Sequence, residues 1–167
     1  MKAADNIIKK LKLVPHPEGG YFKETYRSVG EIPREFLDDG FTGPRNYSTA
    51  IYFMLTSDNY SAFHKVRQDE FWFFHSGSPI ELHMISEEGE HTLVVIGSNI
   101  EIGELPQFVV PGGNWFAAAV VNKNDYSLVS CTVSPGFDFD DFKLANRESL
   151  VDKYPLHEEI IERFTRN

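Results

Sequence analysis

Cysteine is almost absent from this chain of 167 residues, and its scarcity excludes two ways of stabilising a small protein. The one cysteine, Cys131, can form no disulfide within the chain and cannot build a zinc site of the CxxC type. It lies in the apolar run SLVSCTV, where we expect a buried and unreactive thiol. The fold must therefore depend on a hydrophobic core.

Positive charge and long apolar runs are also scarce. The 16 Lys and Arg residues are outnumbered by 25 Asp and Glu residues, which gives a net charge of −9. Nucleic acids and anionic membranes attract clustered basic residues, so neither is an expected partner. No apolar run approaches the roughly 20 residues of a membrane helix, and the beginning, MKAADNIIKKLKLV, lacks the apolar stretch of a secretory signal. We therefore expect a cytoplasmic protein.

The chain is rich in apolar residues (41%) and in phenylalanine, with 14 copies, which suits one domain with a sizeable core. Turn signals such as SDN, HSGSP, SEEGE and PGGN separate short strand-like segments. Many short strands without helices between them favour a β-sandwich or barrel over a parallel sheet. The expected strands cover residues 48–55, 61–66, 70–75, 79–85, 91–97, 107–110, 115–121 and 127–133.

The two ends of the chain have a different pattern. Apolar spacing predicts a helix over residues 5–13, and alternation predicts a strand over 21–28. Helical patterns return at 144–153 and 156–164. We expect one domain in three parts: a helix, arm strand and loop over residues 1–47, a β-barrel core over 48–133, and a capping segment with helices over 134–167.

The segment HKVRQDEFWFFHSG carries the most chemistry. Strand alternation places His64 and Val66 on one face of a strand, and Glu70, Trp72 and Phe74 on one face of the next. If these faces point inward, an imidazole and a carboxylate meet inside an aromatic-walled cavity. A purely structural His–Glu hydrogen bond at the rim is the open alternative.

The spacing in this region resembles the first motif of the cupin superfamily, G-x5-H-x-H-x(3,4)-E-x6-G. The run from Asp58 to Gly77 matches it through His64 and Glu70, and PGG at 111–113 matches the second motif, G-x5-P-x-G-x2-H-x3-N, weakly. Longer runs, HPEGGYFKETYRS, AFHKVRQDEFWFFHSGSPIELHMIS, LPQFVVPGGNWFAA and CTVSPGFDFDDFKLANRESL, resemble a group of small single-domain cupins of unknown function. The resemblance implies a mainly β, double-stranded β-helix (jelly roll) with a short N-terminal helix and C-terminal helices, forming a homodimer.

Departures from the cupin motifs concern the metal ligands. Cupin metal sites usually take three histidines and a glutamate, but this chain has Val66 and Phe116 at two histidine positions and Val120 at the asparagine position. Only His64 and Glu70 remain, and two protein ligands seldom hold a transition metal tightly. We expect no resident metal or other cofactor, with weak binding of a divalent metal at these two residues as the alternative.

Our first functional prediction is a metal-independent enzyme. Some cupins are sugar-nucleotide epimerases that use a histidine base and a tyrosine acid, and the chain resembles them in keeping one inward histidine. His64 oriented by Glu70 would be the base. Tyr52 would be the acid, although strand alternation does not separate it from Tyr47 and Tyr126. Arginines available for a phosphate-bearing substrate are Arg27, Arg45 and Arg67.

Two other functions stay open. An aromatic cavity anchored by His64 and Glu70 also suits a non-catalytic ligand-binding or sensor protein. A metal-dependent dioxygenase, isomerase or decarboxylase is the second alternative. The candidate residues are His64, Glu70 and Tyr52 for catalysis, and Trp72, Phe74, Phe116, Arg67, Val66 and Arg27 for binding a small molecule such as a sugar or sugar nucleotide.

Two further segments flank the expected barrel. The paired glycines of PEGGYFKETYR predict a chain that turns closely past the barrel. Alternatively, Glu18, Glu24 and Arg27 reach a neighbouring pocket, because cupin dimers often exchange an N-terminal strand. We expect SPGFDFDDF to seal one end of the barrel with its phenylalanines.

Overall fold

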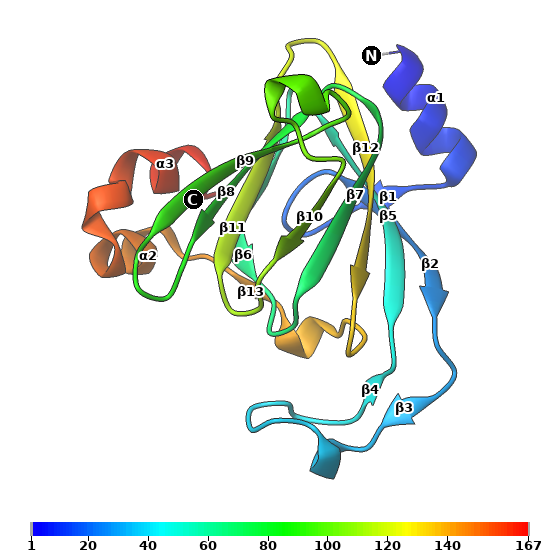
Figure 1. The fold of residues 1–167 in the computed structure, drawn as a ribbon, viewed down its shortest axis with the longest axis vertical. Coiled ribbons are helices and arrows are strands. Elements are labelled where there is room, and N and C mark those ends of the chain that lie inside the picture. Colours follow the sequence, from blue (N-terminus) through cyan, green and yellow to red (C-terminus); the bar gives the residue numbers. More distant parts are fainter. Residues whose placement is uncertain (1, 167) are drawn as a thin grey trace.

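Two antiparallel sheets face each other in the computed structural model, which describes residues 2–166 (Figure 1). In order across the first sheet, the strands are β1 (Val14–Pro15), β2 (Tyr21–Arg27), β5 (Thr49–Thr56), β12 (Tyr126–Val133), β7 (Glu70–Gly77) and β10 (Gln107–Val110). In order across the second sheet, they are β13 (Lys143–Leu144), β6 (Tyr60–Lys65), β11 (Trp115–Val120), β8 (Ile80–Ile85) and β9 (His91–Ile96). The mainly β fold that the sequence predicted is confirmed.

The main core lies between the two sheets. Strand β12 shows why, because every second side chain along it is buried and the remaining ones are only partly so. Val129 and Cys131 point inward from this strand and pack in one cluster with Phe53, Trp72 and Phe116. The two-residue period of a strand thus gives each sheet one apolar face, and the two apolar faces pack together.

Helix α1 (Lys2–Leu11) covers the outer face of the first sheet. Ala4 and Leu13 pack against Met54 of β5. The helix begins three residues before the expected boundary and ends two residues before the expected end. It ends at Leu11 because Lys12 adopts a left-handed backbone, with φ of 56°.

Two helices near the other end of the chain cover the outer face of the second sheet, opposite α1 (Figure 1). Leu150, Ile161 and Phe164 pack there against Phe63 and Ile85. The first helix begins later than predicted, because residue 144 belongs to β13 and a side-chain cap from residue 146 defines the helix start. This region comprises α2 (Arg147–Lys153), the 3-10 turn η4 (Pro155–His157) and α3 (Glu158–Arg163).

The loop that the sequence predicts between the arm strand and the barrel core carries a small sheet of its own, which projects from the barrel at the bottom of Figure 1. The strands of this sheet are β3 (Glu31–Ile32) and β4 (Arg45–Asn46), and the 3-10 turn η1 (Arg34–Phe36) lies between them in the chain. Two further 3-10 turns are η2 (Ile100–Ile102) and η3 (Phe139–Asp141). None of the helices within residues 2–166 combines the length and the apolar character needed to cross a lipid bilayer.

Segment 134–142, which contains η3, lies across one end of the barrel, as its phenylalanines predicted. A buried ion pair fixes it there: Arg45 Nε and Nη2 donate to the two oxygens of Asp141 at 2.7 and 2.8 Å. Gln68 donates a third hydrogen bond to Asp141, at 2.8 Å. The aromatic side chains of this segment are therefore held in place over the space between the sheets.

Candidate active site

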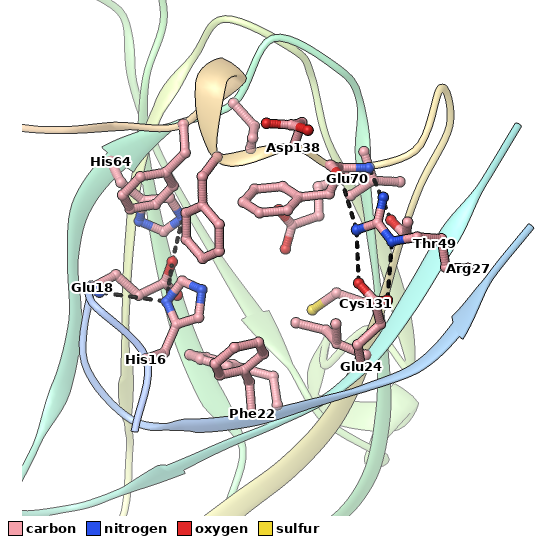
Figure 2. A pocket seen from close by; sticks show the side chains of 17 residues that line it. His16, Glu18, Phe22, Glu24, Arg27, Thr49, His64, Glu70, Cys131 and Asp138 are labelled. Atoms are coloured by element: carbon pink, nitrogen blue, oxygen red, sulfur yellow. Dashed lines mark hydrogen bonds and ion pairs between the residues drawn. The ribbon is translucent and has the colours of Figure 1, made fainter. Parts of the chain in front are cut away.

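A cavity of about 200 Å³ opens between the two sheets beneath segment 134–142. Figure 2 shows His16, Glu18 and His64 on one side of it, and Arg27, Glu24 and Thr49 on the other. Four of the nine residues proposed from the sequence for catalysis or small-molecule binding line this cavity, namely His64, Val66, Glu70 and Arg27, as do Glu18 and Glu24 of the N-terminal segment. The others lie elsewhere.

His64 extends from β6, is almost completely buried, and has both ring nitrogens engaged. Its Nδ1 lies 2.7 Å from the Ala62 carbonyl oxygen, which can only accept, so Nδ1 donates. Its Nε2 lies 3.1 Å from Glu18 Oε2. The carboxylate that orients His64 is therefore Glu18.

The expected pairing of His64 with Glu70 is corrected by this geometry. Glu70 belongs to β7 in the first sheet, whereas His64 belongs to β6 in the second. Within residues 2–166, no hydrogen bond or ion pair joins the two side chains. Both face the same cavity, but from opposite sheets.

The position of Glu18 in the cavity depends on a tight turn at the two glycines that follow it. Gly19 and Gly20 have φ of +118° and +70°, which side chains other than glycine rarely adopt. A β-carbon at Gly19 would also collide with the Tyr60 carbonyl oxygen. The turn consequently runs tightly along β6, where the Glu18 carbonyl accepts a hydrogen bond from the Ala62 amide at 2.9 Å. The close turn that the sequence predicted thus delivers Glu18 into the pocket of its own chain.

A second imidazole contacts the same carboxylate. His16 Nδ1 lies 3.2 Å from Glu18 Oε2, the oxygen that faces His64, and 3.4 Å from the Glu18 amide, which donates to it. Ser61 donates to Oε1 at 2.9 Å. The other ring nitrogen of His16, Nε2, has no hydrogen-bond partner in the part of the chain that the structure describes. Figure 2 shows His16, Glu18 and His64 side by side, and we refer to these three residues as the His–Glu–His cluster.

Charge in this cluster is set by its contacts. Burial alone would raise the pKa of Glu18, but His64, His16 and the Ser61 hydroxyl outweigh it and leave the pKa below its ordinary value. Burial lowers the pKa of His64, an effect that Glu18 and the Ala62 carbonyl partly offset. Since Nδ1 of His64 already donates to a carbonyl, the close Nε2–Oε2 contact needs a proton that the pair shares. The lowered pKa of Glu18 leaves this proton on Nε2 of His64, against the burial that lowers the pKa of His64.

Glu70 has the opposite tendency. Burial, reinforced by the negative charge of Glu18, raises the pKa of Glu70 to about 8, although Cys131 and Trp72 act in the other direction. Glu70 is therefore mostly a neutral acid at pH 7. Burial also raises the pKa of the thiol of Cys131, a residue that is buried as the sequence predicted.

Arg27 is the cation at the mouth of the cavity, and its charge is already matched. Its Nε and Nη2 donate to the two oxygens of Glu24 at 3.0 and 2.8 Å. Nη2 also donates to the Phe137 carbonyl at 3.1 Å, and Nη1 donates to Asn46 at 2.8 Å. The guanidinium therefore supports the rim and carries no surplus charge toward a ligand.

Three phenylalanines of segment 134–142 form the apolar part of the mouth. The rings of Phe137, Phe139 and Phe142 have centroids 5.1 to 6.4 Å apart and meet at steep angles of 68 to 81°. Phe22 of β2 lines the opposite wall beside His16. Aromatic faces therefore line part of the mouth of the cavity.

The three tyrosines considered as the acid all lie outside this cavity. Tyr52 and Tyr126 pack toward α1 on the outer face of the first sheet, and Tyr47 is exposed on the projecting arm. Strand alternation explains the correction, because Ile51 and Phe53 point inward and leave Tyr52 on the other face. The sequence analysis thus placed Tyr52 on the correct strand but on the wrong face of the sheet.

The predicted aromatic wall is core rather than cavity lining. Trp72 and Phe116 are buried, and the Phe116 ring supports His64 from 4.0 Å between centroids. Phe74 packs against the same core. Arg67 lies over the ring of Phe41, 5.4 Å from its centroid, away from the cavity.

Sequence reasoning missed two groups that line the cavity. One is His16, which precedes the glycine turn together with Glu18 and was not considered. The other is the wall formed by segment 134–142, whose phenylalanines were assigned only to sealing. The signals were present in HPEGG and GFDFDDF, where residues with chemical or aromatic character adjoin glycines that permit close approach.

The side chains present do not fit the metal sites of many cupins. Considering residues 2–166, no group of three or more His, Cys, Asp or Glu side chains is arranged so that it could hold a metal ion. His64 Nε2 is directed at Glu18, and positions 66 and 116 carry apolar side chains. We therefore assign no chemical step to a metal.

Comparison with known proteins identifies the family. A family model described as "Cupin superfamily (DUF985)" matches residues 5–145. The chain belongs to the cupin superfamily. This cupin is 34% identical over 144 residues to the uncharacterized protein YML079W of Saccharomyces cerevisiae, and the match covers 81% of this chain and 71% of the yeast protein.

Solved structures agree with this assignment. A hypothetical protein from Leishmania major superposes with a TM-score of 0.89 at 38% identity, covering 98% of this cupin and 99% of that chain. Protein SO0799 from Shewanella oneidensis gives 0.86 at 41% identity, over 98% and 97%. Oxalate decarboxylase from Bacillus subtilis gives 0.55 at 12% identity, over 90% of this cupin and 36% of that chain, and shows the fold alone. The cupin fold inferred from sequence motifs is confirmed.

Proposed function

We propose that this cupin binds a small molecule in the barrel cavity and catalyses metal-independent proton transfer next to a carbonyl group, as isomerases and epimerases do. One observation carries the proposal: two buried carboxylates face the same cavity, and their surroundings shift their pKa values in opposite directions. His64, His16 and the Ser61 hydroxyl outweigh burial and lower the pKa of Glu18, whereas burial raises the pKa of Glu70 to about 8. Environments that push the pKa values of titratable groups apart in this way are typical of acid and base pairs.

The base in this proposal is His16 rather than His64. His64 has its two nitrogens occupied by the Ala62 carbonyl and by Glu18. His16 has Nδ1 directed at Glu18 and Nε2 without a partner among the residues described. The proposal takes the tautomer in which Nδ1 donates to the Glu18 carboxylate instead of accepting from the Glu18 amide at 3.4 Å, because that tautomer leaves Nε2 as the basic nitrogen. Glu18 and His64 then act through His16 as positioning residues.

Glu70 takes the role that the sequence assigned to Tyr52. His16 Nε2 removes the proton from the carbon beside a carbonyl, while Glu70 transfers its own proton to the carbonyl oxygen. The product of this step is a neutral enediol. The protonated His16 then returns its proton to the neighbouring carbon, while the Glu70 carboxylate takes up the proton of an enediol hydroxyl, which completes isomerisation and restores both side chains. General acid–base catalysis of this kind contributes about 10²- to 10⁴-fold in rate.

Hydrogen exchange tests this chemistry even while the product is unidentified. Candidate ketoses and aldoses are incubated with the protein in D2O, and loss of the proton signal beside the carbonyl is followed by NMR. We expect exchange with the wild-type protein, and at least about 100-fold slower exchange after His16→Gln or Glu70→Gln. His75→Gln is the matched control, because His75 is an exposed histidine on the outer face, bonded to Ser130.

Exchange that survives His16→Gln unchanged would show that His16 is not the base. Saturable binding without any exchange would favour the alternative of a non-catalytic binding protein, which the aromatic mouth also suits. The cytoplasmic location and the homodimer inferred from the resemblance stay predictions. Size-exclusion chromatography with light scattering tests the homodimer.

A further inference from the structure

The charges around the cavity restrict which molecules can occupy it. Among the described residues, Arg27 is the one lysine or arginine in its lining, and Glu24 already neutralises it. A guanidinium has five N–H donors, and four of those of Arg27 are used by Glu24, Asn46 and the Phe137 carbonyl. A phosphate group would therefore find no free cation.

Negative charge at the mouth adds to this restriction. Asp138 lines the cavity beside Arg27, and its carboxylate accepts one hydrogen bond, from the Asp140 amide at 2.9 Å. With Glu18 matched by the imidazoles and Glu70 neutral, the lining carries a small negative excess near pH 7. An anionic ligand would meet this negative charge at the mouth and find no unpaired cation in the described lining to offset it.

The size of the cavity points the same way. Its volume of about 200 Å³ is below the roughly 300–1,000 Å³ of pockets that enclose drug-sized ligands. Phe22, Phe137 and Phe142 supply apolar faces for a ring, while the Glu70 carboxyl and the Thr49 hydroxyl remain as donors. A nucleotide attached to a sugar would extend past the aromatic mouth, where Arg27, the basic residue of the described lining, is already paired with Glu24.

We infer that the substrate is an uncharged, hydroxylated carbonyl compound about the size of one sugar ring, with no phosphate or nucleotide attached. The requirement for a carbonyl rests on the proposed function. The limits on charge and size rest on the cavity alone, so they can be tested separately.

The test compares matched pairs of probes by isothermal titration calorimetry: D-fructose with D-fructose 6-phosphate, and D-glucose with UDP-glucose. In the wild-type protein we expect saturable binding of the free sugars and at least tenfold weaker binding of their phosphorylated partners. Glu24→Gln releases Arg27, so the affinity for the phosphate ester relative to the free sugar should rise about tenfold. Asp138→Asn is a second route to the same change, since the amide oxygen can still accept from Asp140. Glu31→Gln, an exposed carboxylate on the arm, is the control and should leave the ratio unchanged.

A phosphorylated probe that binds the wild-type protein as tightly as its free sugar would overturn the inference, and so would failure of every free sugar to bind. Deuterium exchange in the same samples separates this result from the proposed function. Free-sugar binding without exchange supports the inferred size and charge and refutes the chemistry. Exchange confined to a phosphate ester supports the chemistry and refutes the inferred substrate class.

Discussion

Replacing Glu70 by Gln should make the protein more stable at neutral pH while removing the proposed acid. Burial and the charge of Glu18 raise the pKa of Glu70 from 4.5 to about 8. Between these two pH values the folded state holds a proton that the unfolded state has released. The free energy of unfolding therefore falls as the pH rises through this range. Glutamine has a similar shape and no ionisable group, so the variant escapes this loss.

The magnitude follows from the two pKa values. At about 1.36 kcal/mol for each unit of pKa, the wild-type protein loses about 3 kcal/mol at pH 7 and about 1 kcal/mol at pH 5, relative to a side chain that does not titrate. For a chain of this length, about 1 kcal/mol corresponds to about 2–4 °C in the midpoint of thermal unfolding. Glu70→Gln should therefore raise the midpoint by about 6–12 °C at pH 7 and by only about 2–4 °C at pH 5.

Urea unfolding followed by circular dichroism at several pH values between 5 and 8 measures the difference in free energy of unfolding between Glu70→Gln and the wild type. Glu31→Gln serves again as the control, because it removes an exposed carboxylate and should give a profile parallel to that of the wild type. If the Glu70→Gln and wild-type profiles were also parallel, Glu70 would be ionised in the folded protein. Glu70 could then not be the proton donor of the proposed reaction.

Three further changes test other parts of the structure. Gly20→Ala should lower the free energy of unfolding by about 1–3 kcal/mol in urea titrations, because φ is +70° there and the new β-carbon would lie 2.7 Å from the Met54 carbonyl oxygen. An unchanged midpoint of the urea transition would refute the close turn. Arg45→Met should cost about 3–5 kcal/mol, since it leaves the buried Asp141 carboxylate unpaired, and a loss below about 1 kcal/mol would show that Asp141 is solvated. Burial, with His91 and Arg163 nearby, lowers the pKa of His83 from 6.5 to about 4. As the pH falls from 6.5 to 4, the free energy of unfolding of His83→Gln should therefore rise by about 3 kcal/mol relative to that of the wild type. Equal acid sensitivity of the two proteins would contradict this.

The fold could be predicted in some detail because its signals are local. Alternating apolar residues and turn sequences set the eight barrel strands, and the expected core strands 48–55 and 127–133 agree closely with β5 and β12. The helix boundaries were less accurate, since they depend on backbone conformation at single residues. Lys12 ends α1 by entering the left-handed region, and β13 captures Leu144 by pairing with His64. Neither event has a strong signal in composition.

The contacts within the site could be predicted only in part, because strand alternation assigns a side chain to a face and says nothing about its partner. His64 and Glu70 both face the cavity as expected, yet the short loop between them connects strands of two different sheets. The partner of His64 is instead supplied by Glu18, which is 46 residues away in the chain. That contact depends on how closely Gly19 lets the backbone approach β6, a property that a periodicity argument cannot evaluate.

The same substitutions that depart from the cupin metal motif explain why a carboxylate can contact His64 so closely. Val66 and Phe116 stand where additional histidines would converge, and both are buried against the inner core. They offer His64 no polar group, so its Nε2 would be an unsatisfied buried atom without Glu18. Glu18 in turn needs a positive or donating neighbour on each oxygen, and His16, His64 and Ser61 supply them. The absence of further metal ligands and the presence of the His–Glu–His cluster are thus two aspects of one arrangement. In it, the buried imidazole of His64 contacts a carboxylate in place of a metal ion.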